Sequence, residues 1–249
     1  MPQTLTISND KDSGPEIFAS IQGEGINVGA PTAFLRLAHC NLSCIWCDTR
    51  YTWDWQKFDI RIETKKMDLS EIEASIDNLH MSRLVITGGE PLMQQGNLRE
   101  LLVNLYNKGY SLEIETNGTI QPDSILVEVI EFWNVSPKIS NSLLDFDVRI
   151  RNNALKEFAE LPNAYFKFVI QDSADIAEVK EVIDVFGIPV DRIFLMPQGN
   201  TMEKINKINR WYFIYSSRFK CNSHNCPWLI PTPDRAFLTL LQHHVAAED

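Results

Sequence analysis

The sequence has no surplus of basic residues. Its 23 Lys and Arg residues stand against 33 Asp and Glu residues, a formal net charge of −10. Proteins that bind the phosphate backbone of nucleic acids use clustered Lys and Arg residues, so we expect no nucleic-acid partner. No apolar run of about 18 residues is present, so no membrane partner is expected either. The polar N-terminus shows no signal-peptide pattern, and a cytoplasmic location is therefore expected.

Cysteine is also scarce, and its number does not suit a disulfide framework. Of five cysteines, an odd number, Cys40, Cys44 and Cys47 follow one another at a C-x3-C-x2-C spacing. A soft-metal site in a reducing compartment explains this pattern better than paired disulfides. Structural zinc takes four ligands, often from two C-x2-C pairs, and only one such pair occurs. An iron–sulfur cluster also takes four thiolates, so three would leave one iron open.

Six short apolar or β-branched runs alternate with helical patterns, which indicates parallel βαβ units of an α/β fold. Six strands without a seventh or eighth predict an open, partial barrel, and an extra strand is expected within residues 16–25. We expect Ser70 and Glu73 to form a capping box, and Gly109 and Gly187 to end two helices. The expected strands are 32–38, 83–87, 110–115, 132–136, 165–170 and 192–196, and the expected helices are 69–79, 98–108 and 173–186.

Polar or glycine-rich segments follow most of these runs. The cysteines come after the first run, and residues 87–91, 115–118, 136–138 and 196–199 end or follow four others. Because the carboxyl ends of parallel strands share one edge, these segments are expected to meet where α/β proteins place their active sites. Each segment alone also fits an ordinary turn, and it is the shared edge beside the cysteines that favours a site.

The three cysteines, with Trp46 directly before the last, resemble the signature of the radical S-adenosylmethionine (SAM) superfamily. Residues 88–91, Gly-Gly-Glu-Pro, are similar to its G-G-E-P motif. The resemblance implies an open six-stranded parallel β/α barrel of the radical SAM type, with an N-terminal extra strand and a divergent C-terminal tail. It also implies a 4Fe-4S cluster on the cysteines, whose open iron binds SAM and whose electron cleaves SAM to a 5′-deoxyadenosyl radical.

A narrower resemblance covers residues 16–199. Segments 21–25, 47–49 and 51–54, together with Arg36, are similar to the 7-carboxy-7-deazaguanine synthase family. The resemblance implies a lyase that contracts the ring of 6-carboxy-5,6,7,8-tetrahydropterin to 7-carboxy-7-deazaguanine, with loss of ammonia, on the route to queuosine. It also implies Mg²⁺ as a third cofactor, an electron donor such as flavodoxin or ferredoxin, and a homodimer.

The same resemblance implies a role for each site residue. An Arg at the end of a strand suits the substrate carboxylate, and a hydroxyl oxygen suits hard Mg²⁺ better than thiolates do. The cluster ligands are Cys40, Cys44 and Cys47, and the Mg²⁺ ligand is Thr49. The pterin contacts are Ile21, Gln22, Gly23, Arg36 and Thr87. The SAM contacts are Gly89, Glu90, Ser136, Pro137, Lys138, Met196, Pro197, Gln198 and Gly199.

The resemblance stops near residue 220. We therefore predict a core over residues 1–199 and a C-terminal segment over 200–249, with a helix at 234–246. Cys221, His224 and Cys226 in this segment form a second, weaker zinc pattern. Two other functions stay open on the residues alone. A glycyl-radical-enzyme activating enzyme shares the cysteine spacing, and a non-enzymatic zinc-binding module would use the same thiolates.

Overall fold

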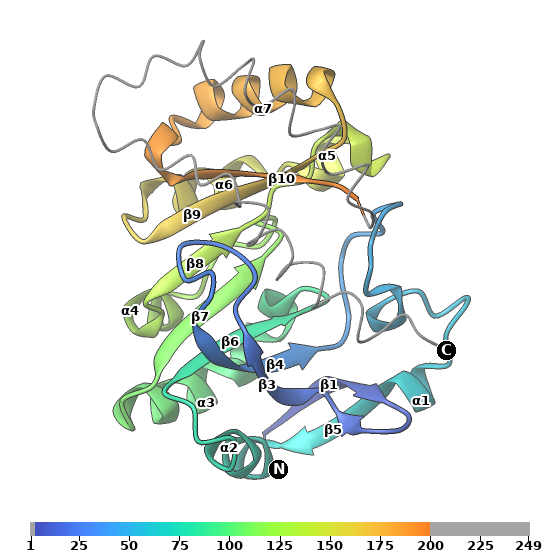
Figure 1. The fold of residues 1–249 in the computed structure, drawn as a ribbon, viewed down its shortest axis with the longest axis vertical. Coiled ribbons are helices and arrows are strands. Elements are labelled where there is room, and N and C mark those ends of the chain that lie inside the picture. Colours follow the sequence, from blue (N-terminus) through green and yellow to red (C-terminus); the bar gives the residue numbers. More distant parts are fainter. Residues whose placement is uncertain (1–2, 200–249) are drawn as a thin grey trace.

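Six parallel strands form the centre of the structure, a computed structural model that describes residues 3–199 (Figure 1). They pair in the order β4, β6, β7, β8, β9, β10, and within the described residues β10 is an edge of the sheet. The prediction of an open six-stranded sheet is confirmed, and each strand lies within one residue of its expected bounds. The strands are β4 (Pro31–Leu37), β6 (Arg83–Gly88), β7 (Ser111–Thr116), β8 (Phe132–Val135), β9 (Ala164–Ile170) and β10 (Ile193–Pro197).

Antiparallel strands extend the sheet on its β4 side. The expected extra strand is β3 (Ile17–Ile21), which pairs antiparallel with β4. Three further strands were not predicted: β1 (Thr4–Asp10), β2 (Gly14–Pro15) and β5 (Thr64–Asp68). Residues 4–8 of β1 pair with β5, its last two residues pair with β2, and it meets β4 only at Ile7 and Leu37. The sequence signal for β5 is weak because Lys65 and Lys66 are exposed and only Met67 is buried.

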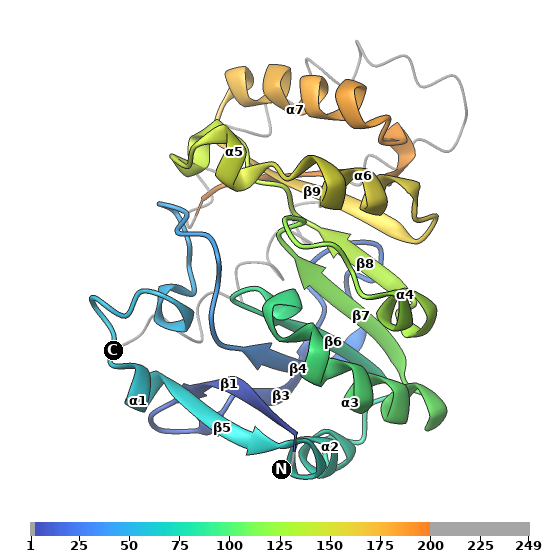
Figure 2. The same cartoon turned by 180° about the vertical axis from the view of Figure 1, so that it is seen from behind.

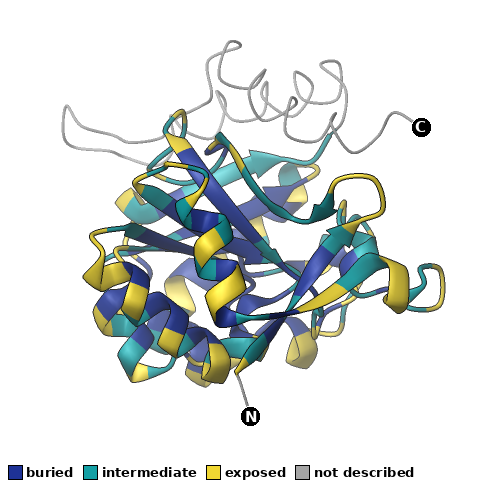
Figure 3. Ribbon diagram, turned by 90° about the horizontal axis from the view of Figure 1, so that it is seen from below, coloured by how far each residue is buried: buried dark blue, intermediate teal, exposed yellow. Residues whose placement is uncertain are grey.

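The larger helices cover one face of this sheet and expose their outer sides to solvent (Figures 2 and 3). Helix α7 has its predicted bounds, and Gly109 and Gly187 adopt left-handed conformations where the predicted helices end. The helices are α1 (Ile60–Glu63), α2 (Leu69–Asp77), α3 (Gln95–Asn107), α4 (Ser124–Val129), α5 (Phe146–Arg149), α6 (Asn152–Glu160) and α7 (Ser173–Phe186), with short 3-10 turns η1 (Arg50–Thr52), η2 (Pro91–Gln94), η3 (Ser140–Ser142) and η4 (Val190–Arg192).

The cap of helix α2 differs from the prediction. Asp68 is the N-cap residue, and the Glu71 carboxylate accepts a hydrogen bond from its backbone N–H (3.2 Å). The expected box at Ser70 and Glu73 was therefore wrong by two residues. Strand β5 runs directly into the helix at Asp68, so the chain turns before Ser70 is reached.

Alternate residues of the parallel strands face opposite sides of the sheet. One side packs under the helices in an apolar core that includes Leu35, Ile86, Ile114, Trp133 and Phe166. The other side is called the lumen face below, and it is polar. The loop that follows β3 crosses this face over β7 and β8 in both views (Figures 1 and 2). The lumen face carries Arg36, Thr87, Glu113, Glu115, Asn134 and Lys167.

Among residues 3–199, no helix has both the length and the apolar character needed to cross a bilayer. The predicted C-terminal segment, its helix at 234–246 and the weaker zinc pattern at Cys221, His224 and Cys226 lie outside the described residues.

Candidate functional site: a cysteine loop at the carboxyl edge of the sheet

The three clustered cysteines lie in the loop that follows β4, as the sequence predicted. Cys44 is buried and Cys40 and Cys47 are half-buried, and all three are free thiols. The Cys47 N–H donates to the carbonyl of Cys44 (3.1 Å), and the Leu42 N–H donates to Cys40 Sγ (3.5 Å). The loop therefore curls back on itself and keeps its three sulfurs in one short segment.

The glycine motif lies directly against this loop. The Gly89 N–H donates to the carbonyl of Leu37 (2.9 Å), and the Glu90 N–H donates to that of His39 (2.7 Å). A Cβ atom on Gly89 would lie 2.0 Å from the His39 carbonyl oxygen, so only glycine permits this approach. The two motifs that resemble the radical SAM signature thus form one packed unit.

The Glu90 side chain joins the glycine motif to residues 116–117. It is fully buried, and its carboxylate accepts hydrogen bonds from Leu92 N (3.0 Å), Thr116 Oγ1 (2.8 Å) and Asn117 N (2.7 Å). Burial raises the pKa of Glu90, and these donors act against that rise. Both carboxylate oxygens therefore bind the protein itself, and the side chain has a bracing role.

Asn117 extends this bracing to the cysteines. Its Nδ2 donates to Asn41 Oδ1 (2.9 Å) and lies 3.9 Å from Cys40 Sγ. The Asn41 amide in turn donates to Thr119 Oγ1 (2.8 Å). The segments after β4, β6 and β7 are therefore brought together at one edge, as the sequence analysis expected.

The segment after β8 supplies a cation beside the cysteine loop. The Ser136 N–H donates to the carbonyl of Thr116 (2.7 Å), and Lys138 Nζ donates to Ser136 Oγ (2.9 Å). Lys138 Nζ also lies 5.5 Å from the centroid of the Trp46 ring, a cation–π distance. Burial lowers the pKa of Lys138, while the nearby Cys44 works against that shift. Ser136 and Pro137 are buried beside it.

The end of the cysteine loop carries the predicted Mg²⁺ ligand. Thr49 Oγ1 lies 3.6 Å from Cys47 Sγ, and the Trp53 indole N–H donates to the same sulfur (3.3 Å). The carbonyl of Thr49 accepts both the N–H and the hydroxyl of Thr52 (3.0 and 2.8 Å), which fixes the backbone at this point. The Thr49 hydroxyl, a ligand suited to a hard metal such as Mg²⁺, thus lies next to the Cys47 thiol, a ligand suited to a soft metal.

The thiols themselves fit a metal-bound state. Burial raises the pKa of Cys40 to about 12 and also raises that of Cys44, and Lys138 only partly offsets this. Their thiolates therefore require a bound cation, as metal-ligating thiolates do. Among residues 3–199, no three His, Cys, Asp or Glu side chains already surround one ion position.

Arg36 lies on the lumen face, opposite Thr87 in the register of β4 and β6. Its Nε donates to Glu16 Oε1 (3.1 Å), which also accepts the Tyr51 hydroxyl (3.1 Å). Burial acts to lower the pKa of Arg36, but Tyr51 and the carboxylates of Glu16 and Glu115 outweigh it and raise that pKa. The guanidinium is therefore a permanent, oriented positive charge, suited to a carboxylate ligand.

Three charged residues on or over the lumen face, Glu24, Glu115 and Lys167, were given no individual role in the sequence analysis. Thr87 Oγ1 donates to Glu115 Oε2 (2.7 Å), and Lys167 Nζ forms an ion pair with Glu24 Oε2 (2.5 Å). Burial raises the pKa of Glu115 to about 7, Glu24 adds to the rise, and Lys167 opposes it. Glu115 can thus hold or release a proton near neutral pH. For Glu115 and Lys167, the available signal in the sequence was a charged residue at an alternate position of an apolar strand.

Of the predicted pterin contacts, Gln22 is almost completely buried, while Ile21 is exposed. The Gln22 side chain binds the protein: Nε2 donates to Glu113 Oε1 (2.5 Å) and Glu115 Oε1 (3.2 Å), and Oε1 accepts from Glu24 N (3.1 Å). Gly23 is buried next to it. The structure therefore places residues 21–23 over the lumen face, with the orientation of the Gln22 amide fixed.

The predicted SAM segment 196–199 lies at the same edge of the sheet, on its far side from β4. Met196 and Pro197 end β10, and the Gln198 N–H donates to the carbonyl of Ile170 at the end of β9 (2.8 Å). All four residues, Gly199 included, are half-buried. Every predicted cluster, Mg²⁺ and SAM residue thus lies at or just beyond this one edge, while their contacts with ligands stay predictions.

Comparison with known proteins agrees with this geometry. Residues 36–203 match the family model of the radical SAM superfamily. A curated 7-carboxy-7-deazaguanine synthase from Pyrobaculum aerophilum is 41% identical over 191 residues, which are 76% of this chain and 80% of that protein. One from Hyperthermus butylicus is 37% identical, over 77% of this chain and 78% of that protein. The fold is similar to the crystal structure of QueE from Escherichia coli, with a TM-score of 0.62, 23% identity and coverage of 86% and 91%.

These matches and the site define the class of protein: the chain belongs to the radical SAM superfamily. A 4Fe-4S cluster and SAM are therefore its cofactors. Within that superfamily, the chain belongs to the 7-carboxy-7-deazaguanine synthase family. Membership makes it an enzyme and removes the non-enzymatic zinc module from consideration.

Proposed function

We propose that this chain converts 6-carboxy-5,6,7,8-tetrahydropterin to 7-carboxy-7-deazaguanine with loss of ammonia, in queuosine biosynthesis. One observation carries the proposal: the cysteine loop and the glycine motif pack together at the edge of a polar lumen face. The 41% identity to a curated synthase, over 76% of this chain, supports the same reaction. A glycyl-radical-enzyme activating enzyme would instead act on a protein backbone, and the named relatives argue against it.

Cys40, Cys44 and Cys47 would hold the cluster, which with SAM supplies the radical that starts the reaction. Gly89 and the backbone of Glu90 lie within hydrogen-bond contact of the strand that ends at the cysteines, so they would face the same ligand. The segments 136–138 and 196–199 would line the SAM site from the other strand ends. The chain's part is to hold these groups in place and keep water away.

Arg36 and Thr87 would orient the pterin at the lumen face, with Ile21, Gln22 and Gly23 above it. Arg36 is held by Glu16, so its guanidinium presents a fixed charge to a substrate carboxylate. The Thr87 hydroxyl donates to Glu115, so the binding of a substrate at Thr87 would depend on whether Glu115 is protonated. These contacts explain why the enzyme would select a substrate that carries a carboxylate.

Other assignments of the proposal rest mainly on the family resemblance. Thr49 would bind Mg²⁺, and its hydroxyl next to Cys47 supports that placement. A flavodoxin or ferredoxin would supply the electron, and the enzyme would act as a cytoplasmic homodimer. The core would span residues 1–199, followed by the C-terminal segment 200–249.

The decisive experiment is turnover by the purified, reconstituted protein. Anaerobic protein should bind roughly four iron and four sulfide per chain. With SAM, reductant, Mg²⁺ and 6-carboxytetrahydropterin, it should form 7-carboxy-7-deazaguanine, detected by mass spectrometry. The Cys44→Ala variant should lose both cluster and product. A cluster-loaded protein that cleaves SAM but makes no deazapurine from this pterin would refute the proposed function.

A further inference from the structure

Glu113 is a buried carboxylate to which no role has been given so far. It lies on β7 two residues before Glu115, with no exposed surface, and faces the lumen side of the sheet. Burial raises the pKa of Glu113, while hydrogen bonds from Asn27 and Gln22 act against the rise. Burying a carboxylate costs free energy unless several hydrogen-bond donors surround it. The donors that surround Glu113 therefore indicate its role.

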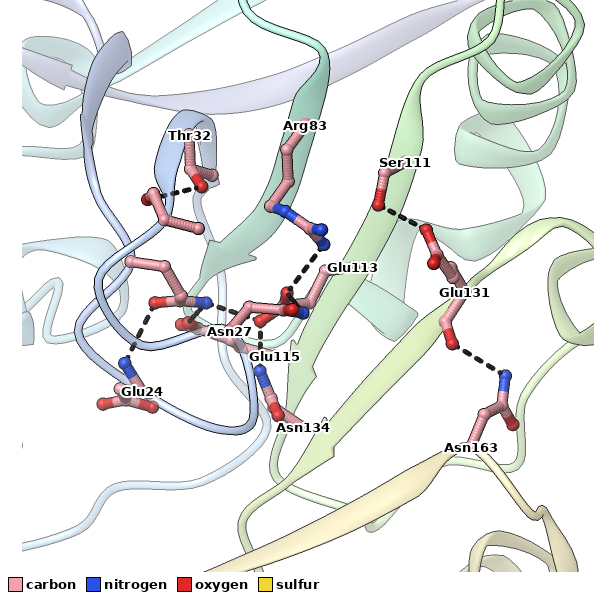
Figure 4. Close-up of polar contacts among 12 residues, drawn as sticks. Glu24, Asn27, Thr32, Arg83, Ser111, Glu113, Glu115, Glu131, Asn134 and Asn163 are labelled. Atoms are coloured by element: carbon pink, nitrogen blue, oxygen red, sulfur yellow. Dashed lines mark hydrogen bonds and ion pairs between the residues drawn. The ribbon is translucent and has the colours of Figure 1, made fainter. Parts of the chain in front are cut away.

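Three side-chain amides donate to this one carboxylate (Figure 4). Gln22 Nε2 donates to Oε1 (2.5 Å), and Asn134 Nδ2 donates to the same oxygen. Asn27 Nδ2 donates to Oε2 (2.8 Å), and Arg83 Nη1 lies 3.8 Å from it. A carboxylate is acceptor-only, whereas an amide presents both a donor and an acceptor, so this set of partners requires a carboxylate.

Two of the amides come from the two ends of one loop, residues 22–27. Between them, Gly25 has a φ of +66°, and a Cβ atom on it would lie 2.2 Å from Asn134 Oδ1. The loop therefore presses against the side chain that Glu113 also holds. On its outer side, Glu24 reaches Lys167 of β9 in the 2.5 Å ion pair described above. The loop is thus pinned across β7, β8 and β9, and Glu113 binds both of its ends.

We propose that Glu113 is a positioning residue that fixes loop 22–27 as a rigid wall over the lumen face. It also sets the orientation of the Gln22 amide, whose Nε2 is directed to Glu113 and Glu115 while Oε1 accepts from Glu24 N. The effect of Glu113 on pterin binding rests on the proposed function, since residues 21–23 are the predicted pterin contacts of this chain. The pinning of the loop does not depend on it.

The first test is Glu113→Gln, which keeps the size of the side chain but turns one acceptor into a donor. At least one of the three amides then faces another N–H. We expect the KM for the pterin to rise roughly tenfold or more, the size expected for loss of a hydrogen bond to a charged group. Iron content and SAM cleavage without pterin should stay unchanged, because the cysteine loop is not part of this network. The matched control is Glu100→Gln, at an exposed position on α3.

The second test is a rescue that a general loss of stability would not show. Adding Asn27→Asp to Glu113→Gln places a carboxylate where the new amide can donate to it, while the other end of that amide still accepts from Gln22 and Asn134. We expect the KM of the double variant to return to within roughly threefold of the wild type, with Asn27→Asp alone impaired because two carboxylates then face each other. A KM that stays unchanged in Glu113→Gln, or is not rescued in the double variant, would overturn the inference.

A third measurement separates this inference from the proposed function. Backbone hydrogen bonds from Gln22 N to Ala30 O (2.9 Å) and from Gly29 N to Gln22 O (2.8 Å) close the loop, so their amide exchange reports on its rigidity. In protein without cluster or substrate, Glu113→Gln should exchange these amides roughly tenfold faster, and the double variant should restore protection. Unchanged exchange would refute the pinning role even in an active enzyme. If Glu113→Gln does not fold, Asn27→Ala takes its place, because it removes only one donor. It should raise the KM for the pterin and speed the amide exchange of Gln22 and Gly29, both by a smaller factor.

Discussion

Replacing Gly89 by alanine tests the central structural conclusion, that the glycine motif and the cysteine loop form one unit. The added methyl carbon would lie 2.0 Å from the His39 carbonyl oxygen and 2.5 Å from its carbonyl carbon. Both are backbone atoms at the end of β4, so no side-chain rotation relieves the contact. Residues 89–90 must therefore move away from the cysteine loop.

That movement breaks two backbone hydrogen bonds, from Gly89 to Leu37 (2.9 Å) and from Glu90 to His39 (2.7 Å). Each contributes about 1 kcal/mol, and a forced steric contact costs about 1–3 kcal/mol more. Alanine recovers about 0.4–1 kcal/mol by restricting the unfolded chain. We therefore expect Gly89→Ala to lower the free energy of unfolding by about 2–4.5 kcal/mol, out of the roughly 5–15 kcal/mol typical of a domain.

Urea denaturation of the metal-free protein under reducing conditions measures this loss, and iron content after reconstitution measures the effect on the cluster. Gly96→Ala is the control, because Gly96 lies in helix α3 with nothing within 4 Å of the added methyl. It should be neutral or stabilise by up to about 1 kcal/mol, through better helix propensity. If Gly89→Ala is as stable as Gly96→Ala and loads the same iron, the motifs are not packed together as the structure shows.

Three further predictions address other parts of the site. Burial raises the pKa of Glu115 from 4.5 to about 7, so the folded state holds this proton more tightly than the unfolded chain and stability falls as pH rises through that window. Glu115→Gln should flatten the wild-type fall in Tm between about pH 5 and 8, and an unchanged pH profile would contradict the raised pKa. Trp53→Phe removes the N–H donated to Cys47 Sγ (3.3 Å), so the cluster potential should fall in an EPR redox titration, while Trp55→Phe should leave it unchanged. Lys167→Met breaks the ion pair with Glu24 and should raise the KM for the pterin while pterin-independent SAM cleavage persists; equal loss of both activities would place Lys167 elsewhere in the mechanism.

Much of the parallel sheet was predictable because its strands contain runs of buried residues, such as residues 32–35 of β4 and 84–87 of β6. These runs stand out against the polar loops. Helix α7 was located at its bounds for another reason: Ile176, Val179, Val182 and Ile183 recur at helical spacing, and Gly187 ends the helix. Strands β1, β2 and β5 were missed because none of them contains a continuous run of buried apolar residues. In β5 the side chains of Lys65 and Lys66 are exposed and only Met67 is buried, which is too weak a pattern to identify a strand. The α2 cap was misplaced because nothing local shows that β5 continues up to Asp68.

The functional site, like the fold, was predictable only where a local sequence pattern encodes it. Cysteine spacing and the Gly-Gly-Glu-Pro motif are local patterns, so the sequence sufficed to predict a radical SAM site at one edge of a parallel sheet. Their contact through Gly89 and His39 depends on pairing β4 with β6, whose residues lie about fifty positions apart in the chain.

The lumen network was decided by the tertiary structure alone. Glu113 appears in the sequence as an ordinary charged residue in a strand, and Glu115 only as the first residue of the predicted edge segment 115–118. Lys167 and Glu24 are separated by 143 positions. Only the curvature of the sheet and the path of loop 22–27 bring them together, because hydrogen bonds and ion pairs depend on distance in space and not along the chain. The predicted cluster ligands Cys40, Cys44 and Cys47 follow from their local spacing. The contacts that join loop 22–27 to Glu113 and Lys167 form only in the folded protein, because they link residues that are far apart in the chain.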